Sequence, residues 1–539
     1  MLFNSYTFIF AFLPVALAGF HLASRFGRRP AAAWLILTSF VFYGWWSPTF
    51  VLLLIASTLF NYGASEAVAA FESRPRLRTT CLCLAITVNL LVLCYYKYLT
   101  TVLHALTNLG LLDDPVSAIV LPLGISFFTF TQIGYLIDRN QGLVKESGFL
   151  NYLLFVTFFP HLIAGPILHH REIMPQFADG RSYRFSYENI AAGMTIFIMG
   201  LVKKCLLADP LSATVIAGLG NIHHLSMLSA WNVALSYSLQ LYFDFSGYSD
   251  MAIGLARMFN IHFPLNFNSP YKAASIIDHW QRWHMTLSRY LRLYLYNPIS
   301  LAVTRWRVAH GLGITRNAQA TFGGFVTMML VPTLITMLLA GIWHGAGLQF
   351  VIFGLLHGTY LTINHAFRIF RSGKPRPAHL QPVMLRCSNI LLTYLAALVA
   401  SIFFRAASVG SGFSLLGGMI GLHGAGSIAL PMVLLAKLGG MGQSLMGSGF
   451  VSVVSILDWT AGVAHFGWLI VLYAIVWGMP NTQQIMRNYI EPSLGRVTAG
   501  PLPQFAWRPN RGWAVVVGAL TSIGILAIGG TTEFLYFQF

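Results

Sequence analysis

The chain has 539 residues, of which 56% are apolar and only 9% are charged. Ordinary soluble proteins carry about 25% charged residues, so this composition excludes a soluble domain and indicates a membrane protein. The net charge of +17 does not indicate a nucleic-acid-binding protein, because the basic residues lie in short loops between apolar segments rather than in one patch.

Apolar stretches follow one another along most of the chain. A helix that rises about 1.5 Å per residue needs about 20 mostly apolar residues to cross roughly 30 Å of hydrocarbon. The stretches are 6–22, 32–46, 50–70, 81–96, 116–137, 150–168, 189–207, 231–255, 322–342, 350–370, 391–404, 464–477 and 513–528. We predict an all-α polytopic membrane protein with about 11 to 13 spans.

Short basic loops set the expected orientation. The stretch 6–22 is not expected to be a cleaved signal peptide, because no basic residue precedes it and Arg25 follows it. Loops rich in Lys and Arg mark the cytoplasmic side. Such loops lie at 25–29, 74–78, 368–376 and 487–511, which places both termini outside. Lys203 and Lys204 do not fit unless a hydrophobic segment between residues 150 and 207 fails to cross fully.

Two polar stretches in the first half of the chain interrupt apolar sequence, where ionisable side chains are costly and usually line a cavity. FPHLIAGP, at 159–166, is a proline-flanked break that carries His161. LYFDFSGYSD, at 241–250, places Asp244 and Asp250 beside four hydroxyl side chains. These groups either support a cavity or satisfy one another's hydrogen bonds.

The stretch DHWQRWHMTLSR, at 278–289, has the pattern of an amphipathic helix. One stripe at helical spacing holds Trp280, Trp283, Leu287, Tyr290, Leu291 and Tyr294, and another holds His279, Arg282, Thr286 and Arg289. We expect a helix that lies at the cytoplasmic interface or dips into the protein, with aromatics at the lipid boundary and arginines towards water or phosphate. An interfacial anchor that binds nothing is the alternative. His284 lies off the exposed stripe and is a candidate functional residue.

The stretch GIWHGAG, at 341–347, places His344 among three glycines. Such glycines break a helix and let the backbone approach another group closely. A neutral imidazole is a suitable general base near neutral pH, although a lone His in apolar sequence is often a hydrogen-bonded core residue.

Metal sites, disulfides and a serine hydrolase are not expected. The five cysteines form no CxxC pair. Neither HExxH nor GxSxG occurs, and neighbouring pairs such as His169 and His170 do not easily chelate one ion.

These motifs together resemble the membrane-bound O-acyltransferase superfamily, in particular its bacterial branch of alginate O-acetyltransferases and teichoic acid D-alanyl transferases. The matching segments are FVFYGWWSPTF, LPLGISFFTFTQIGYLID, FFPHLIAGPILHHREIMPQF, QLYFDFSGYSDMAIGLA, DHWQRWHMTLSRYLR and GIWHGAGLQFVIFGLLHG. The resemblance covers residues 1–370 and returns at the last span and tail. It implies a ring of tilted helices and re-entrant helices around a tunnel, with His344 as the catalytic histidine and His284 as the second signature histidine.

The resemblance also implies a location, a donor and partners. It places the chain in the bacterial inner membrane, with both termini in the periplasm, among membrane lipid and an exopolysaccharide synthesis complex. The expected donor is cytoplasmic acetyl-CoA, with no bound cofactor, and a periplasmic SGNH-type partner completes transfer to the polysaccharide. His344 is then the base that activates a hydroxyl for attack on the thioester. The candidate donor-binding and pocket residues are Lys272, Arg282, Arg289, Trp283, Trp343, Asp244, Asp250 and His161, with the cations facing coenzyme A phosphates.

The chain ends in FLYFQF, at 534–539, directly after the last apolar stretch. Family tails of the pattern FxYxxF have been linked to a tyrosine acyl carrier, and Phe534, Tyr536 and Phe539 fit each fixed position. A phenol, with a pKa of about 10, makes a more activated ester than an aliphatic hydroxyl does. We therefore expect Tyr536 to relay the acyl group on the outer face, the alternative being an aromatic tail at the membrane interface.

The sequence departs from the alginate-type pattern in two places, so it does not decide which polymer is modified. Tyr296-Asn297-Pro298-Ile299 stands where alginate-type enzymes carry a GGNR-like loop, and the Gly-rich stretch 408–452 has no clear counterpart, so cellulose fits as well as alginate. A polysaccharide or lipid transporter, or an anchor subunit without chemistry, remains the alternative.

We expect one integral-membrane domain, residues 1–539, with five parts along the chain. These are N-terminal helices (1–270), cytoplasmic interfacial or re-entrant helices (271–310), a core with the catalytic histidine (311–370), C-terminal helices (371–512) and the last span with its external tail (513–539). The Gly-rich insert at 408–452 suggests re-entrant or kinked pieces.

Overall fold

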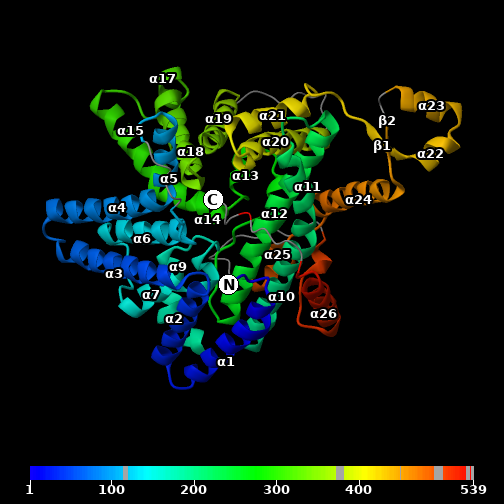
Figure 1. The fold of residues 1–539 in the computed structure, drawn as a ribbon. Coiled ribbons are helices and arrows are strands. Elements are labelled where there is room, and N and C mark those ends of the chain that lie inside the picture. Colours follow the sequence, from blue (N-terminus) through cyan, green and yellow to red (C-terminus); the bar gives the residue numbers. More distant parts are fainter. Residues whose placement is uncertain (113–118, 372–381, 449–450, 491–501, 530–534, 536–539) are drawn as a thin grey trace.

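A computed structural model describes residues 1–112, 119–371, 382–448, 451–490, 502–529 and 535. Helices dominate these residues, and their strands form one two-stranded sheet. The predicted all-α polytopic class is therefore confirmed. Figure 1 shows the helices arranged around a central region that holds α13 and α14.

The first third of the chain forms helical hairpins on one side of the molecule. Its elements are η1 (Thr7–Phe12), α1 (Leu13–Ser24), α2 (Arg28–Gly44), α3 (Pro48–Ala70), α4 (Pro75–Lys97), α5 (Leu99–Asn108), α6 (Ile125–Asn140), α7 (Phe149–Thr157), α8 (Phe159–Leu162), α9 (His170–Ala178) and η2 (Gly180–Tyr183). Pro48 and Pro75 occupy first helical positions, where a missing N–H costs nothing. Helices α3, α4 and α6 contact one another and form one layer (Figure 1).

The centre of the fold is a close pair of helices, α10 (Tyr187–Val202) and α12 (Met227–Met258). A Cβ at Gly200 would lie 2.5 Å from the carbonyl oxygen of Gly247, and one at Gly254 would lie 2.5 Å from that of Gly193. Only glycine permits this approach, as in other membrane helix pairs. The seam continues into η3 (Lys203–Ala208) and α11 (Asp209–Gly220), which also contact α12.

The segment predicted as one helix is broken into two in the structure, so the single helix and its lipid-facing aromatics were wrong, while the alternative position inside the protein agrees with the structure. Its elements are η4 (Pro270–Lys272), α13 (Ile276–Trp280), α14 (Met285–Leu291) and η5 (Arg292–Tyr296). The helix ends at Trp280 and restarts after His284, whose φ of 40° is left-handed. Trp280 and Tyr290 are buried rather than at a lipid boundary. The segment lies inside the protein, so its pattern reflects two buried faces.

The next elements carry the other motif histidine. They are α15 (Asn297–Ala309), α16 (Arg316–Gln319), α17 (Phe322–Phe325), η6 (Val326–Leu330), α18 (Val331–His344) and α19 (Leu348–Phe370). Helices α18 and α19 pack along each other, and α19 packs on α20.

The C-terminal third ends in a projecting unit and a last apolar helix. Its elements are α20 (Pro382–Arg405), α21 (Val409–Met419), β1 (Ile428–Pro431), α22 (Met432–Lys437), α23 (Gly440–Gly447), β2 (Val451–Val454), α24 (Ile456–Gly478), α25 (Thr482–Ile485), η7 (Arg487–Tyr489), η8 (Pro503–Phe505) and α26 (Arg511–Leu526). The strands β1 and β2 are parallel, with Ile428 opposite Val451. The Gly-rich stretch is thus built of short helices and a strand pair, which extend to the right in Figure 1.

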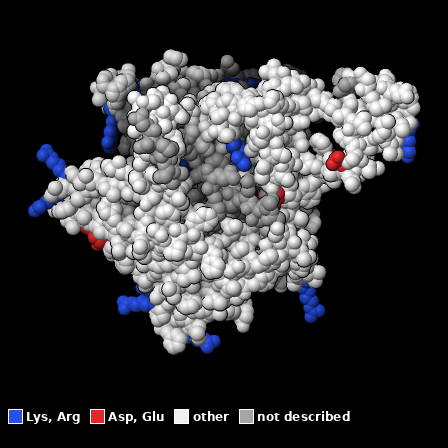
Figure 2. Space-filling view, in the orientation of Figure 1, with Lys and Arg blue, Asp and Glu red and all other residues white. Residues whose placement is uncertain are grey.

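Seven helices in the described part of the chain are long and apolar enough to cross a membrane, fewer than predicted. They are 7–24, 48–70, 75–97, 187–220, 322–344, 383–405 and 456–478. The stretch 150–168 yields only the short helices α7 and α8, because Phe158 leaves the helical conformation before Pro160. Figure 2 shows Lys and Arg side chains mostly at the outer edges of this face rather than in one patch.

Candidate active site

His344 is the last residue of α18 and is almost completely buried. Three aromatic rings surround its imidazole: the centroids of Trp343, Phe353 and Phe404 lie 4.8, 5.7 and 5.0 Å away. Rings of this kind exclude water from the reacting group. The imidazole therefore lies in an apolar wall that shields it from water.

Two glycines of GIWHGAG allow the close packing that forms this apolar wall. A Cβ at Gly341 would lie 2.3 Å from the carbonyl oxygen of Phe350, so Gly341 brings α18 and α19 together. Gly345 ends α18, and a Cβ there would lie 2.1 Å from the Phe350 ring. The predicted close approach is present, but the helix break follows His344 instead of surrounding it.

The end of α4 fixes the end of α18. Lys97 Nζ donates a hydrogen bond to the carbonyl oxygen of Trp343, and the Tyr98 hydroxyl donates to that of Ile342 at 2.8 Å. Cationic and hydroxyl donors satisfy the last carbonyls of a helix and complement its negative end. This pair holds the residues just before His344 in place.

His284 precedes α14 and is held by a side chain distant in sequence. Its Nδ1 lies 2.9 Å from Oδ1 of Asn266. An amide oxygen only accepts hydrogen bonds, so Nδ1 carries the hydrogen and Nε2 keeps its lone pair. Burial lowers the pKa of His284 to about 3, which keeps the ring neutral at neutral pH.

Asn266 is itself completely buried and fully engaged. Its Oδ1 accepts from the backbone N–H of Thr286 at 3.3 Å, which fixes the amide orientation because that group can only donate. Its Oδ1 also accepts from Thr286 Oγ1 at 2.8 Å, and its Nδ2 donates to Ser249 Oγ at 2.9 Å. The backbone N–H of Ile167 donates to the same Thr286 hydroxyl at 3.0 Å. Asn266 therefore joins α12, the start of α14 and the proline-flanked loop around one imidazole.

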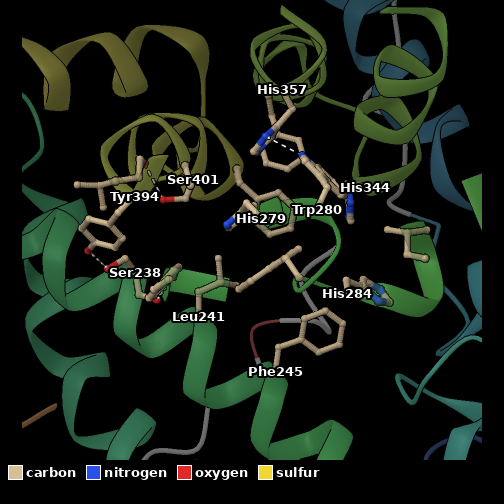
Figure 3. Close-up of a pocket in the computed structure, with 17 residues that line it drawn as sticks. Ser238, Leu241, Phe245, His279, Trp280, His284, His344, His357, Tyr394 and Ser401 are labelled. Carbon is tan, nitrogen blue, oxygen red and sulfur yellow. Dashed lines mark hydrogen bonds between the residues drawn. The ribbon is translucent and has the colours of Figure 1, made fainter. Parts of the chain in front are cut away.

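A cavity, here called the histidine pocket, brings His279, His284, His344 and His357 together (Figure 3). Residues of α12, α13, α14, α18, α19 and α20 line it. Trp280 Nε1–H donates to His357 Nδ1 at 3.2 Å. At the other end of the pocket the Tyr394 hydroxyl lies 2.7 Å from Ser238 Oγ.

Two further cavities adjoin the histidine pocket through shared residues. The Lys97 pocket is lined by Trp46, Lys97, residues 121–127, Ile163, Trp343 and His344. His344 thus lines both cavities. The Arg289 pocket, lined by Arg289 and Arg292 among others, shares Trp280 with the histidine pocket.

Comparisons with known proteins identify the family to which this chain belongs. The model of the membrane-bound O-acyltransferase family matches residues 86–309. The chain is 39% identical to a peptidoglycan O-acetyltransferase of Helicobacter pylori, over 79% of this chain and 80% of the relative. It is 36% identical to a probable alginate O-acetylase of Pseudomonas aeruginosa, over 75% of this chain and 72% of the relative. The chain belongs to the membrane-bound O-acyltransferase family.

Because it belongs to this family, the chain is an O-acyltransferase. Its sequence is also similar to that of an enzyme that transfers another acyl group. A teichoic acid D-alanyltransferase of Bacillus subtilis is 30% identical over 46% of this chain and 59% of the relative. Family membership therefore favours an enzyme over the alternatives of a transporter or of an anchor subunit without chemistry.

The structure of this O-acyltransferase brings some predicted site residues together. His284, His344 and Trp283 line the histidine pocket, and Trp343 lines the Lys97 pocket, where its ring stacks on Phe130 with centroids 5.0 Å apart. Tyr536 lies outside the described residues.

The predicted donor cations lie in different places. Arg289 lines the Arg289 pocket and pairs with both carboxylate oxygens of Glu172. Arg282 pairs with Asp278 at 2.7 Å, and Lys272 donates to the carbonyl oxygen of Met479 at 2.7 Å. Neither Arg282 nor Lys272 lines the three cavities. Only Arg289 of the three therefore faces a space that a donor can occupy.

The remaining candidates lie outside the histidine pocket. Asp244 and Asp250 form buried ion pairs with Lys204 and Lys203. These pairs explain why the two lysines do not mark a cytoplasmic loop. His161 is buried in α8 against Phe263, with ring centroids 6.0 Å apart. It lines neither the histidine pocket nor the Lys97 pocket.

One group of side chains in the described residues has the composition of a metal site. Ligand atoms of Asp138, His169 and His170 lie within 4.8 Å of one another. His169 Nδ1 accepts the backbone N–H of Arg171 at 3.3 Å, which leaves the hydrogen on Nε2, the atom that faces Asp138. Burial raises the pKa of Asp138, but hydrogen bonds from both histidines and Tyr294 outweigh it and lower the pKa. In this structure hydrogen bonds from both histidines and Tyr294 satisfy the Asp138 carboxylate.

Sequence reasoning missed several residues that shape the site. Asn266, Lys97, His357 and Trp280 orient the histidines or line the cavities. Asn266 stands in the segment LNFNSPY, where an amide within an apolar, proline-flanked loop was the available signal. Lys97 also had a signal, because it is a lone cation at the end of an apolar span.

Proposed function

We propose that this O-acyltransferase takes an acetyl group from acetyl-CoA on the cytoplasmic side and passes it across the inner membrane for O-acetylation of an extracellular polysaccharide. The single observation that carries the proposal is that His344 lines two cavities at once. A base in the common wall serves a donor that arrives from one cavity and an acceptor that arrives from the other.

The sequence of cavities suits a coenzyme A donor. Arg289 and Arg292 line the outer cavity, and guanidinium groups bind phosphate bidentately. Trp280 separates this cavity from the histidine pocket, so a slender thioester arm that passes Trp280 arrives among the four histidines. In this reading the Arg289 side chain exchanges Glu172 for donor phosphate.

The chemistry at His344 is nucleophilic acyl transfer. The neutral imidazole accepts the proton of the attacking hydroxyl, a carbon–oxygen bond forms at the thioester carbonyl, and the carbon–sulfur bond breaks. The proton then passes from the imidazole to the departing thiolate, so coenzyme A leaves as a thiol. Desolvation by Phe353, Phe404 and Trp343 suppresses hydrolysis of the thioester.

Tyr536 is the proposed acceptor of the first transfer. A phenyl ester lies between a thioester and a sugar ester in reactivity, because phenol, with a pKa of about 10, is a better leaving group than a sugar hydroxyl. A periplasmic SGNH-type partner then moves the acetyl group to the polymer. The relatives named above act on peptidoglycan, alginate and teichoic acid, so we assign the choice of polymer, cellulose included, to the partner.

The proposal is tested by release of coenzyme A from acetyl-CoA by the purified chain in lipid nanodiscs. The chain should release coenzyme A in one burst that is stoichiometric with Tyr536, and Tyr536→Phe should abolish the burst. Lys272→Gln is the matched control, since Lys272 lines none of the three cavities. A burst of full size from Tyr536→Phe would contradict the relay, and none from the native chain would contradict the donor.

A further inference from the structure

Two neighbouring lysines between α10 and α11 form buried ion pairs with different carboxylates of α12. Lys203 Nζ lies 2.6 Å from Asp250 Oδ2. Lys204 Nζ lies 2.6 Å from Asp244 Oδ1 and 2.7 Å from Asp209 Oδ1. The side chains of Lys204 and Asp244 are each 2% exposed. Charges buried this deeply are expensive and mark function or fold specificity in membrane proteins.

Each carboxylate also holds a later segment of the chain. Asp250 accepts hydrogen bonds from Thr482 Oγ1 at 2.7 Å and Gln483 Nε2 at 3.0 Å, which ties α25 to α12. Asp244 Oδ2 accepts the backbone N–H of Leu535 at 3.3 Å. The first carboxylate thus fixes a helix by its side chains, whereas the second receives a main-chain amide close to the C-terminus.

The side chain of Leu535 is buried in the wall of the histidine pocket. Leu535 is 1% exposed and packs in one apolar cluster with Tyr237, Leu241, Phe350, Phe353 and Phe404. Leu241, Phe353 and Phe404 line the histidine pocket. The rings of Phe353 and Phe404 also contact the ring of His344. A single shell of side chains therefore separates Leu535 from the imidazole.

We propose that Asp244 is the docking residue for the chain's own C-terminal segment. Lys204, which also pairs with Asp209, keeps the Asp244 carboxylate ionised and in position to accept the hydrogen bond. The backbone amide of Leu535 binds Asp244 while its side chain fills the aromatic cluster. A carboxylate that receives a main-chain N–H is a charge-assisted contact, independent of side-chain identity. The two contacts seat the segment from inside the bundle.

Docking at Leu535 deepens the proposed function and rests on it for one point only, the role of Tyr536. Tyr536 directly follows Leu535 in the sequence, so a chain fixed at Leu535 is fixed one residue before the proposed acyl carrier. Asp244 is in this sense a positioning residue, because it touches the tail and not the reacting atoms.

Trimming of the full-length chain by carboxypeptidase Y, followed by intact mass, tests the docking without any donor. In the native chain, trimming should stop before Leu535, because its amide and side chain are engaged. Asp244→Ala should let trimming pass Leu535 at least tenfold faster. Asp250→Ala is the matched control, since it removes the neighbouring carboxylate of α12 without touching the tail, and it should keep the native stop.

A second variant keeps the test sharp if Asp244→Ala unfolds. Leu535→Ser removes the buried leucine without changing the bundle and should also abolish the stop. Native trimming in both Asp244→Ala and Leu535→Ser would overturn the docking proposal. The expected stop in the native chain and its loss in both variants, together with an unmodified Tyr536 in the native chain after incubation with acetyl-CoA, would keep the docking and contradict the relay, so the two proposals fail separately.

Discussion

The two signature histidines occupy the same pocket but are held in opposite ways. His344 ends a long apolar helix, and the contacts of its ring are with aromatic side chains. His284 stands at a helix start with a left-handed backbone, and Asn266 fixes its Nδ1. Packing thus places one imidazole, and a hydrogen bond orients the other.

This difference indicates a division of labour. A ring in an apolar wall with two cavities beside it is suited to take and return a proton. A ring whose Nδ1 is held by Asn266 presents its Nε2 in one fixed direction, which suits it to hold a reacting group in place. We infer that His344 moves the proton and that His284 orients the reacting groups.

The largest effect is expected for His344→Gln. General base catalysis contributes about 10²–10⁴-fold, so donor turnover should fall by at least about 10²-fold. The melting temperature in detergent should change little, because Gln fills a similar volume. Turnover within about threefold of the native rate would show that packing, and not the base, matters at this position.

The next effect is expected for Asn266→Ala, which leaves His284 Nδ1 without its acceptor. Donor turnover should fall by about 10-fold or more, because the ring loses its orientation. The matched variant is Ser249→Ala, which removes one hydrogen bond of the Asn266 amide and leaves its contact with His284, so its loss should be smaller. Equal activity of Asn266→Ala and the native chain would contradict the claim that Asn266 orients His284 for the reaction.

A smaller effect is expected at the donor side. Arg289→Gln should raise KM for acetyl-CoA several-fold while kcat stays nearly constant, because the guanidinium binds phosphate and not the reacting carbonyl. Arg282→Gln is the control, as Arg282 pairs with Asp278 away from the cavities. A larger KM change in Arg282→Gln than in Arg289→Gln would relocate the donor site.

The smallest effect is expected on stability at acid pH, where the contribution of His284 can be measured by comparing the native chain with His284→Asn. Its folded pKa is about 3 against an ordinary value of 6.5, so between these pH values the unfolded chain binds more protons. Stability is therefore lost as pH falls through this window, by up to about 1.4 kcal/mol per pH unit. His284→Asn, which tolerates the left-handed backbone, should lose less melting temperature between pH 6.5 and 5. Identical acid profiles would contradict the buried neutral ring.

The sequence alone predicted the class, the family and the residues that carry the motifs. His344 was singled out because it stands among glycines in apolar sequence, and His284 because it lies off the exposed stripe of its segment. Asn266 was not found, because its bond to His284 closes a contact over 18 residues that periodicity does not show. The prediction of lipid-facing aromatics was wrong for the same reason: at Trp280 and Tyr290 a buried aromatic face has the pattern of a lipid-facing one.

Charge counting misled the orientation argument at one point. Lys203 and Lys204 looked like a basic loop, yet each is paired with a carboxylate of α12. Their partners are 47 and 40 residues away in sequence, so only the close packing of α10 on α12 brings them together. Rules that count cations in loops do not apply to cations neutralised inside a bundle.

The most direct test of the account is the mass of the C-terminal peptide after the purified chain is incubated with acetyl-CoA. Chymotryptic or acid cleavage followed by mass spectrometry should find one acetyl group on Tyr536 in the native chain. The same peptide should be unmodified in His344→Gln. An acetylated Tyr536 in His344→Gln, or an unmodified Tyr536 in a native chain that turns over acetyl-CoA, would contradict the account.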